Sequence, residues 1–68
     1  MGQSNSNVGK AVAFYDYDEK GEEVRLVGVV ISEFREPIGE DPLGRLNYNV
    51  KTGNGSHYTP YAHECFAP

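Results

Sequence analysis

Residues 22–36, EEVRLVGVVISEFRE, decide the fold class of this 68-residue chain. The run is rich in β-branched residues and alternates in a way that is typical of a strand. Val24 and Leu26 lie on one face of such a strand and Val29 on the other, so the phase changes at Gly28. A glycine at a change of phase is typical of a β-bulge or a sharp bend. We therefore predict one long strand that bends at Gly28 and can serve two sheets, as small barrels require.

A shorter strand is predicted before it, at residues 11–17 (AVAFYDY). Val12 and Phe14 lie on one face of this strand, and the opposite face also carries alanine and tyrosine. A strand that is apolar on both faces is typical of a sheet covered on both sides or of a barrel wall. Residues 18–21 (DEKG) then form a hairpin turn, because Gly21 readily takes the positive φ that closes it.

The second half of the chain continues the pattern of strands and turns. Two prolines and two glycines in residues 36–44 (EPIGEDPLG) predict a loop. Residues 45–51 (RLNYNVK) alternate apolar and polar side chains over the length of a strand. A turn of the Asn-Gly type at residues 52–55 leads into a returning strand at residues 56–59.

The C-terminal segment differs from the strands. Thr59 can cap a helix and Pro60 suits its first position, so we predict a single helical or 3-10 turn across residues 59–64. Cys65 and Phe66 then form a short final strand. Together these elements predict an all-β fold, a small five-stranded barrel with a bent second strand and a short 3-10 turn near the C-terminus.

The chain is long enough for one domain. Residues 8–68 form the predicted β domain, and the polar residues 1–7 (MGQSNSN) form a predicted disordered tail. Cys65 is the single cysteine, so no internal disulfide can form and a reducing, cytoplasmic setting fits best. No apolar run approaches the roughly 20 residues that cross a bilayer, which argues against a membrane protein.

The charge balance is acidic, with ten Asp and Glu against six Lys and Arg, a net charge of −4. Proteins bind nucleic acid largely by neutralising its phosphates, so this charge argues against a nucleic-acid partner. An alternative stays open, a nucleic-acid-associated barrel of the Tudor or KOW type in which Tyr48 and Tyr58 stack on bases. That alternative requires a basic face made of Arg25, Arg35, Arg45 and Lys51.

The sequence contains no constellation of residues that indicates an enzyme. It has no glycine-rich phosphate loop and no paired-carboxylate motif, and nothing places a nucleophile beside a base. His57, His63 and Cys65 are the candidate metal ligands, but structural zinc takes four ligands in closely spaced pairs. We therefore predict no catalytic residue, no cofactor and no metal site.

Tyrosine is the most informative residue type in this chain. Five tyrosines are more than a small core can bury with every hydroxyl paired, so some must lie at the surface, where tyrosine favours interfaces. The hairpin topology could bring the tyrosines from the two ends of the chain together. The predicted partner-binding residues are Tyr15, Tyr17, Asp18, Glu22, Tyr58 and Tyr61.

Residues 13–18 (AFYDYD) resemble the Ala-Leu-Tyr-Asp-Tyr opening of Src-homology-3 domains. The order of long loops, hairpin, 3-10-like turn and short last strand is also similar to that five-stranded barrel. The resemblance implies that Tyr15 and Tyr17 line a groove for proline-rich helices, where acidic residues of the first loop select a basic ligand residue. Tyr61, after Pro60, lies roughly where the family has its own proline and tyrosine. The chain lacks the tryptophan around which that groove is built.

These observations lead us to expect a non-enzymatic protein–protein interaction module. Such a module would act as an accessory subunit, or as a regulator or inhibitor of a larger complex. An exposed edge strand could also pair two copies of the chain. The N-terminal residues fit the N-myristoylation pattern, so membrane attachment would require acylation of Gly2.

Overall fold

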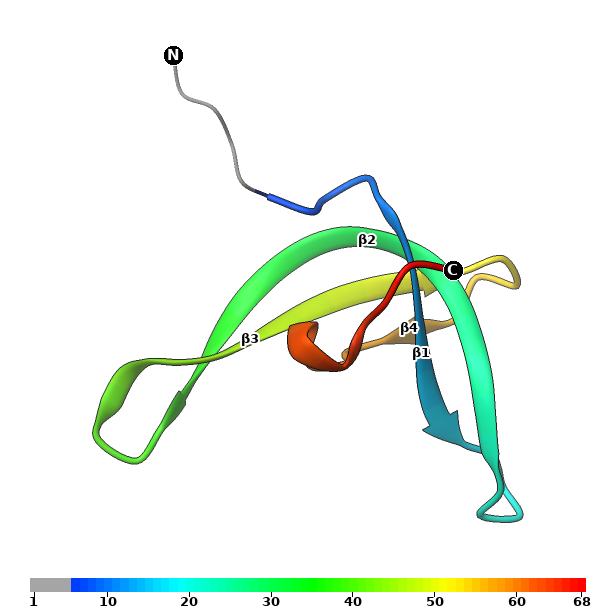
Figure 1. Cartoon of the computed structure of the whole chain (residues 1–68), viewed down its shortest axis with the longest axis horizontal. Coiled ribbons are helices and arrows are strands. Elements are labelled where there is room, and N and C mark those ends of the chain that lie inside the picture. The colour runs from blue at the N-terminus through cyan, green and yellow to red at the C-terminus, as the bar shows by residue number, and fades with distance from the viewer. Residues whose placement is uncertain (1–5) are drawn as a thin grey trace.

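The computed structural model describes residues 6–68, and they form one antiparallel sheet with strand order β1-β2-β3-β4 (Figure 1). The elements are β1 (Ala11–Tyr17), β2 (Glu23–Ile38), β3 (Asp41–Thr52), β4 (His57–Tyr58) and the 3-10 helix η1 (Ala62–Glu64). Within this range there is no α-helix. The predicted all-β class is confirmed.

The 3-10 turn near the C-terminus is also confirmed, although its predicted cap is wrong. Tyr61 precedes η1 as its N-cap, with no side-chain hydrogen bond at that end, whereas Thr59 and Pro60 lie upstream of the helix. The helix closes through local backbone bonds, from the Glu64 N–H to the Tyr61 carbonyl and from the Cys65 N–H to the Ala62 carbonyl.

The predicted five-stranded closed barrel is wrong, because the described residues form an open four-stranded sheet. The predicted last strand at Cys65 and Phe66 is reduced to one isolated bridge between Phe66 and Ala13. The physical reason lies in η1, where the N–H of Glu64, the residue that would pair with Tyr15, donates to the Tyr61 carbonyl instead. The segment before Phe66 therefore cannot extend its pairing along β1.

The sequence predicted a change of register in β2 at Gly28, and none occurs there. Gly28 sits in regular register between Val12 and Thr52, and the first register shift falls between Val30 and Ser32. Figure 1 shows β2 as a long arc between β1 and β3. Gly28 serves close packing instead, because a Cβ atom there would lie 2.6 Å from the carbonyl oxygen of Lys51.

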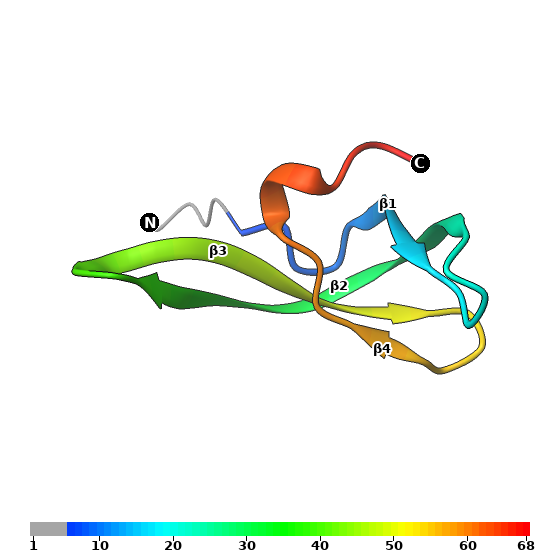
Figure 2. The same ribbon diagram turned by 90° about the horizontal axis from the view of Figure 1, so that it is seen from below.

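Residues 36–44 do not form the predicted loop, because β2 and β3 continue through this region as a projecting hairpin (Figures 1 and 2). Ile38 pairs with Asp41, and Gly39 takes a positive φ of 56° in the tight turn between them. Gly44 also has a positive φ, and a Cβ atom there would collide with the Glu36 carbonyl. The prolines are thus accommodated by irregular pairing instead of breaking the strands.

The core lies on the inner face of the curved sheet. Phe14, Val30, Tyr48 and Val50 are its buried hydrophobic cluster. Figure 2 shows η1 and the C-terminal segment on one side of the sheet, and Ala62 and Cys65 pack against the cluster from there. Partly buried Val12, Leu26, Leu46 and Tyr58 surround it. The outer face stays open, because its apolar side chains Val27, Val29 and Ile31 are each more than two-fifths exposed.

The predicted tail and the predicted acylation site at Gly2 fall largely on residues 1–5, which lie outside the described residues. The following Asn7 is half-buried, and its side-chain Nδ2 donates to the Tyr48 hydroxyl at 2.6 Å. The Asn7 backbone N–H also donates to the Glu33 carboxylate at 3.3 Å. Residue 7 is therefore tied to the sheet.

Candidate functional site

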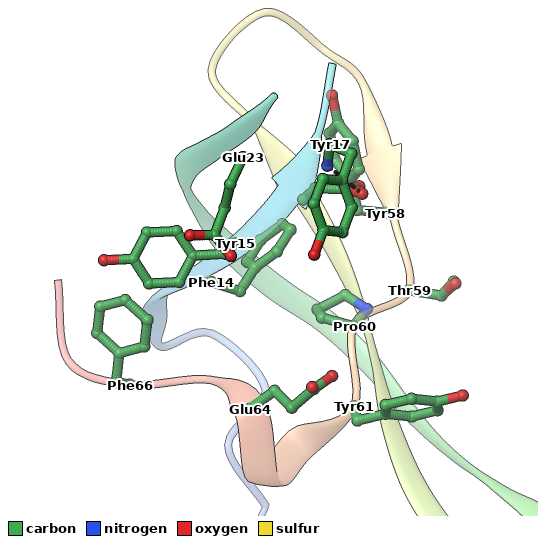
Figure 3. A pocket seen from close by; sticks show the side chains of 11 residues that line it. Phe14, Tyr15, Tyr17, Glu23, Tyr58, Thr59, Pro60, Tyr61, Glu64 and Phe66 are labelled. Carbon is green, nitrogen blue, oxygen red and sulfur yellow. Dashed lines mark hydrogen bonds between the residues drawn. The ribbon is translucent and has the colours of Figure 1, made fainter. Parts of the chain in front are cut away.

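A groove of about 700 Å³ lies between the free edge of β1 and the segment that runs from β4 to η1 (Figure 3). Its walls are mainly aromatic and acidic, with Thr59 and Pro60 on the β4 side. The groove exists because the sheet curls without closing: β1 and β4 are its two edge strands, and one bridge at Phe66 spans part of the gap. The groove therefore lies where further strand pairing would have closed the sheet into a barrel.

Four of the six predicted partner-binding residues line this groove. Tyr15 and Tyr17 come from β1, Tyr58 comes from β4, and Tyr61 directly precedes η1 (Figure 3). Tyr17 and Tyr15 are 69% and 54% exposed, so their rings are available to a ligand, whereas Tyr58 and Tyr61 are half-buried.

The other two predicted residues, Asp18 and Glu22, do not line the groove. Asp18 organises the β1–β2 turn, because its Oδ1 accepts hydrogen bonds from the N–H groups of Lys20 and Glu22, both at 2.9 Å. Glu22 is exposed beside the same turn.

Three other carboxylates line the groove, and none of them was predicted from the sequence as a site residue. They are Asp16, Glu23 and Glu64. Glu23 pairs with Tyr17 at the end of the β1–β2 ladder, and Asp16 lies beside it in β1. Counting residues on each side of the predicted turn at Gly21 could have placed Glu23 opposite Tyr17. The position of Glu64 could not be found in this way, because it depends on the 3-10 helix. No lysine or arginine lines the groove, so its charge is negative.

The aromatic walls are held by ring contacts. Phe14, which is 2% exposed, packs against Tyr58 with ring centroids 5.7 Å apart. Tyr15 lies 5.5 Å from Phe66, and the Arg25 guanidinium lies 5.8 Å from the Phe66 ring centroid. These contacts fix the wall formed by the C-terminal segment against the wall formed by β1.

Tyr61 has two ring contacts of its own. The Arg45 guanidinium lies 4.3 Å from the Tyr61 ring centroid, and the His63 ring stacks on it at 5.7 Å with an interplanar angle of 5°. A cation over a ring face at this distance is favourable by about 0.5–2 kcal/mol. Arg45 thus stabilises the groove from outside its lining.

Cys65 lies next to this site but has the chemistry of a core residue. Burial raises the pKa of the Cys65 thiol, and the negative charge of Glu64 raises it further. The Cys65 Sγ–H also donates to the Tyr61 carbonyl at 3.5 Å, which favours the protonated thiol. A thiol that resists ionisation is a poor nucleophile and a poor metal ligand.

The remaining features bear on other functions. Nowhere in residues 6–68 do three His, Cys, Asp or Glu side chains gather to hold a metal ion. The described part of the chain also contains no helix long and apolar enough to span a bilayer. Tyr48, expected to stack on bases in the nucleic-acid alternative, is 6% exposed and belongs to the core. Tyr48 is therefore not available for base stacking.

Comparison with protein-family models, with curated proteins and with solved structures finds no match for this chain.

Proposed function

We propose that this chain is a non-enzymatic protein interaction module and that its groove binds a cationic segment of a protein partner. The observation that carries the proposal is the composition of the groove: exposed tyrosine rings beside three carboxylates, with no lysine or arginine in the lining. Tyrosine supplies a large, rigid contact area at low entropic cost, and the carboxylates favour lysine or arginine on the ligand.

The negative groove also weighs against the nucleic-acid alternative. A phosphate backbone would meet Asp16, Glu23 and Glu64 and would be repelled. A cationic protein segment would instead be attracted, and it would associate faster at low ionic strength. The function that fits is docking on a partner, as an accessory subunit or as a regulator of a larger complex.

The test is a selection of displayed random dodecapeptides with the wild-type chain as bait. We expect the enriched peptides to carry lysine or arginine. Glu23→Gln and Glu64→Gln should each weaken the selected peptide by about 2–5-fold, the range for an exposed ion pair. Added salt should reduce this difference. Glu40→Gln is the matched control, because Glu40 is exposed at the tip of the β2–β3 hairpin, outside the groove.

The aromatic contribution has its own matched pair of variants. Tyr17→Ala should weaken peptide binding by about 10-fold, since exposed tyrosines at interfaces commonly contribute more than 1 kcal/mol. Leu43→Ala removes a side chain of similar exposure, 67% against 69%, from the distant hairpin and should leave binding unchanged. Selection of peptides without basic residues, or equal binding by all these variants, would overturn the proposed function.

A further inference from the structure

β1 is an edge strand of the sheet, and alternate residues of its backbone face the groove. In antiparallel pairing, every second residue of an edge strand directs its N–H and C=O away from the neighbouring strand. Ala13 is such a residue, because its N–H donates to Phe66 at 2.8 Å and its carbonyl accepts from Phe66 at 2.9 Å. The same alternation turns the N–H and C=O of Tyr15 outward, two residues further along β1.

The C-terminal segment does not pair with Tyr15. Antiparallel register continued from the Ala13–Phe66 bridge would place Glu64 opposite Tyr15. Glu64 lies in η1 instead, where its N–H donates to the Tyr61 carbonyl at 3.0 Å. Pairing along this edge therefore stops after one bridge, and the groove opens beside Tyr15 (Figure 3).

The next outward-facing residue of β1 is Tyr17, and its backbone N–H is already bound. It donates to the Asp16 carboxylate at 2.8 Å. Tyr15 is thus the position within the groove where both backbone groups of β1 face outward without a backbone partner. An unpaired strand edge is a template for pairing with another chain.

We infer that the groove takes its ligand as an added β-strand, which pairs with the β1 edge at Tyr15 in the place that a fifth strand would fill. This inference rests on the proposed function, and it specifies how the cationic segment is held. Main-chain hydrogen bonds supply affinity in strand addition, and pockets for alternate side chains supply specificity.

The occupant is an extended segment of a protein partner with alternating apolar and basic side chains. Successive side chains of a strand point to opposite faces. One set then reaches the half-buried ring of Tyr58, and the other set reaches carboxylates such as Glu23 and Glu64. A proline-rich helix would not use the β1 edge, because proline has no N–H to offer the Tyr15 carbonyl.

The first test is an N-methyl scan of the tightest cationic peptide from the dodecapeptide selection, measured on the wild-type chain. Strand addition predicts one position at which an N-methyl group costs about 10-fold in affinity, the ligand residue whose amide donates to the Tyr15 carbonyl. N-methyl groups on the two neighbouring residues should cost much less, because their amides face away from β1. Bound peptide should also slow hydrogen exchange of the Tyr15 amide.

The second test compares Tyr15→Pro with Tyr15→Val. The outward N–H of Tyr15 takes no part in the β1–β2 ladder, and an edge strand tolerates proline at such a position. Both variants lose the ring, but only proline loses the N–H. We expect the proline variant to bind about 10-fold more weakly than the valine variant at matched stability. If proline unfolds the chain, the N-methyl scan decides.

The outcomes separate this inference from the proposed function. Groove binding in which no N-methyl position costs more than its neighbours, or in which the Tyr15→Pro and Tyr15→Val variants bind equally, overturns strand addition and leaves the interaction module standing. A selection that yields no cationic peptide overturns both. If the chain dimerises in sedimentation and Tyr15→Pro abolishes the dimer, the occupant is a second copy and the inferred partner segment is wrong.

Discussion

Ala13 and Phe66 exchange two backbone hydrogen bonds, at 2.8 Å and 2.9 Å, and so join the C-terminal segment to the first strand. Ala13 is fully buried. The bridge also holds Cys65 and η1 over the inner face of the sheet, where Ala62 and Cys65 pack against the core. One residue pair thus closes part of the sheet and leaves the rest open as the groove.

Deleting residues 65–68 should destabilise the domain by about 3 kcal/mol. The deletion removes two backbone hydrogen bonds at Ala13, the ring contact of Phe66 and the packing of Cys65. Chains of this length have a free energy of unfolding of only about 3–10 kcal/mol, so the deletion would remove a large part of the stability. Urea unfolding followed by circular dichroism measures the change.

Deleting residues 67–68 is the control, because Ala67 and Pro68 are exposed and follow the bridge. It should change the free energy of unfolding by no more than about 0.5 kcal/mol. Equal stability of the two truncated chains would show that the bridge contributes nothing.

The strand content was predictable from the sequence because local alternation carries it, as in residues 45–51, which lie wholly within β3. Closure of the sheet was not predictable. It depends on whether the N–H of Glu64 bonds within η1 or to β1, a competition that no local pattern reveals. The hairpin at residues 36–44 was missed for a similar reason, since its prolines lie where the pairing is irregular.

The site was partly predictable. Four tyrosines from the two ends of the chain do line one groove, as hairpin topology suggested. The carboxylates of the groove were not predicted, because no local pattern distinguishes them from Asp18 and Glu22, which lie outside the lining. Asp18 instead organises the turn through two short-range backbone hydrogen bonds.

Gly28→Ala should destabilise the domain by about 1–3 kcal/mol, the usual cost of overpacking. A Cβ atom at residue 28 would lie 2.6 Å from both the Lys51 carbonyl oxygen and Val50 Cγ1, so β2 and β3 would have to separate. Gly53→Ala is the matched control, because a Cβ atom there meets nothing within 4 Å. Thermal melting measures the change. If both variants have the melting temperature of the wild type, close packing at Gly28 contributes nothing to stability.

Tyr48→Phe should cost about 1 kcal/mol, because the Tyr48 hydroxyl accepts a hydrogen bond from Asn7 Nδ2 at 2.6 Å. Tyr17→Phe is the control, since the Tyr17 side chain is 69% exposed. Tyr48→Phe should also speed hydrogen exchange of the Asn7 backbone amide, which donates to the Glu33 carboxylate. Unchanged exchange and stability would place residue 7 outside the folded domain.

Cys65 should react with iodoacetamide more slowly than a free cysteine at every pH below its raised pKa, because the thiolate is the reactive form. Burial raises the pKa of the thiol, with Glu64 as the second cause. The folded-state pKa thus exceeds the unfolded one, so the unfolded chain loses its proton first as the pH rises. The thiol's contribution to stability is fully present below the unfolded-state pKa and is lost as the pH rises through the folded-state pKa. Cys65→Ala removes this titration together with the packing of the side chain. The difference in free energy of unfolding between the two chains should therefore be constant below the unfolded-state pKa and change only in alkaline solution. A difference that varies with pH in acidic solution, or alkylation as fast as that of free cysteine, would contradict the raised pKa of this thiol.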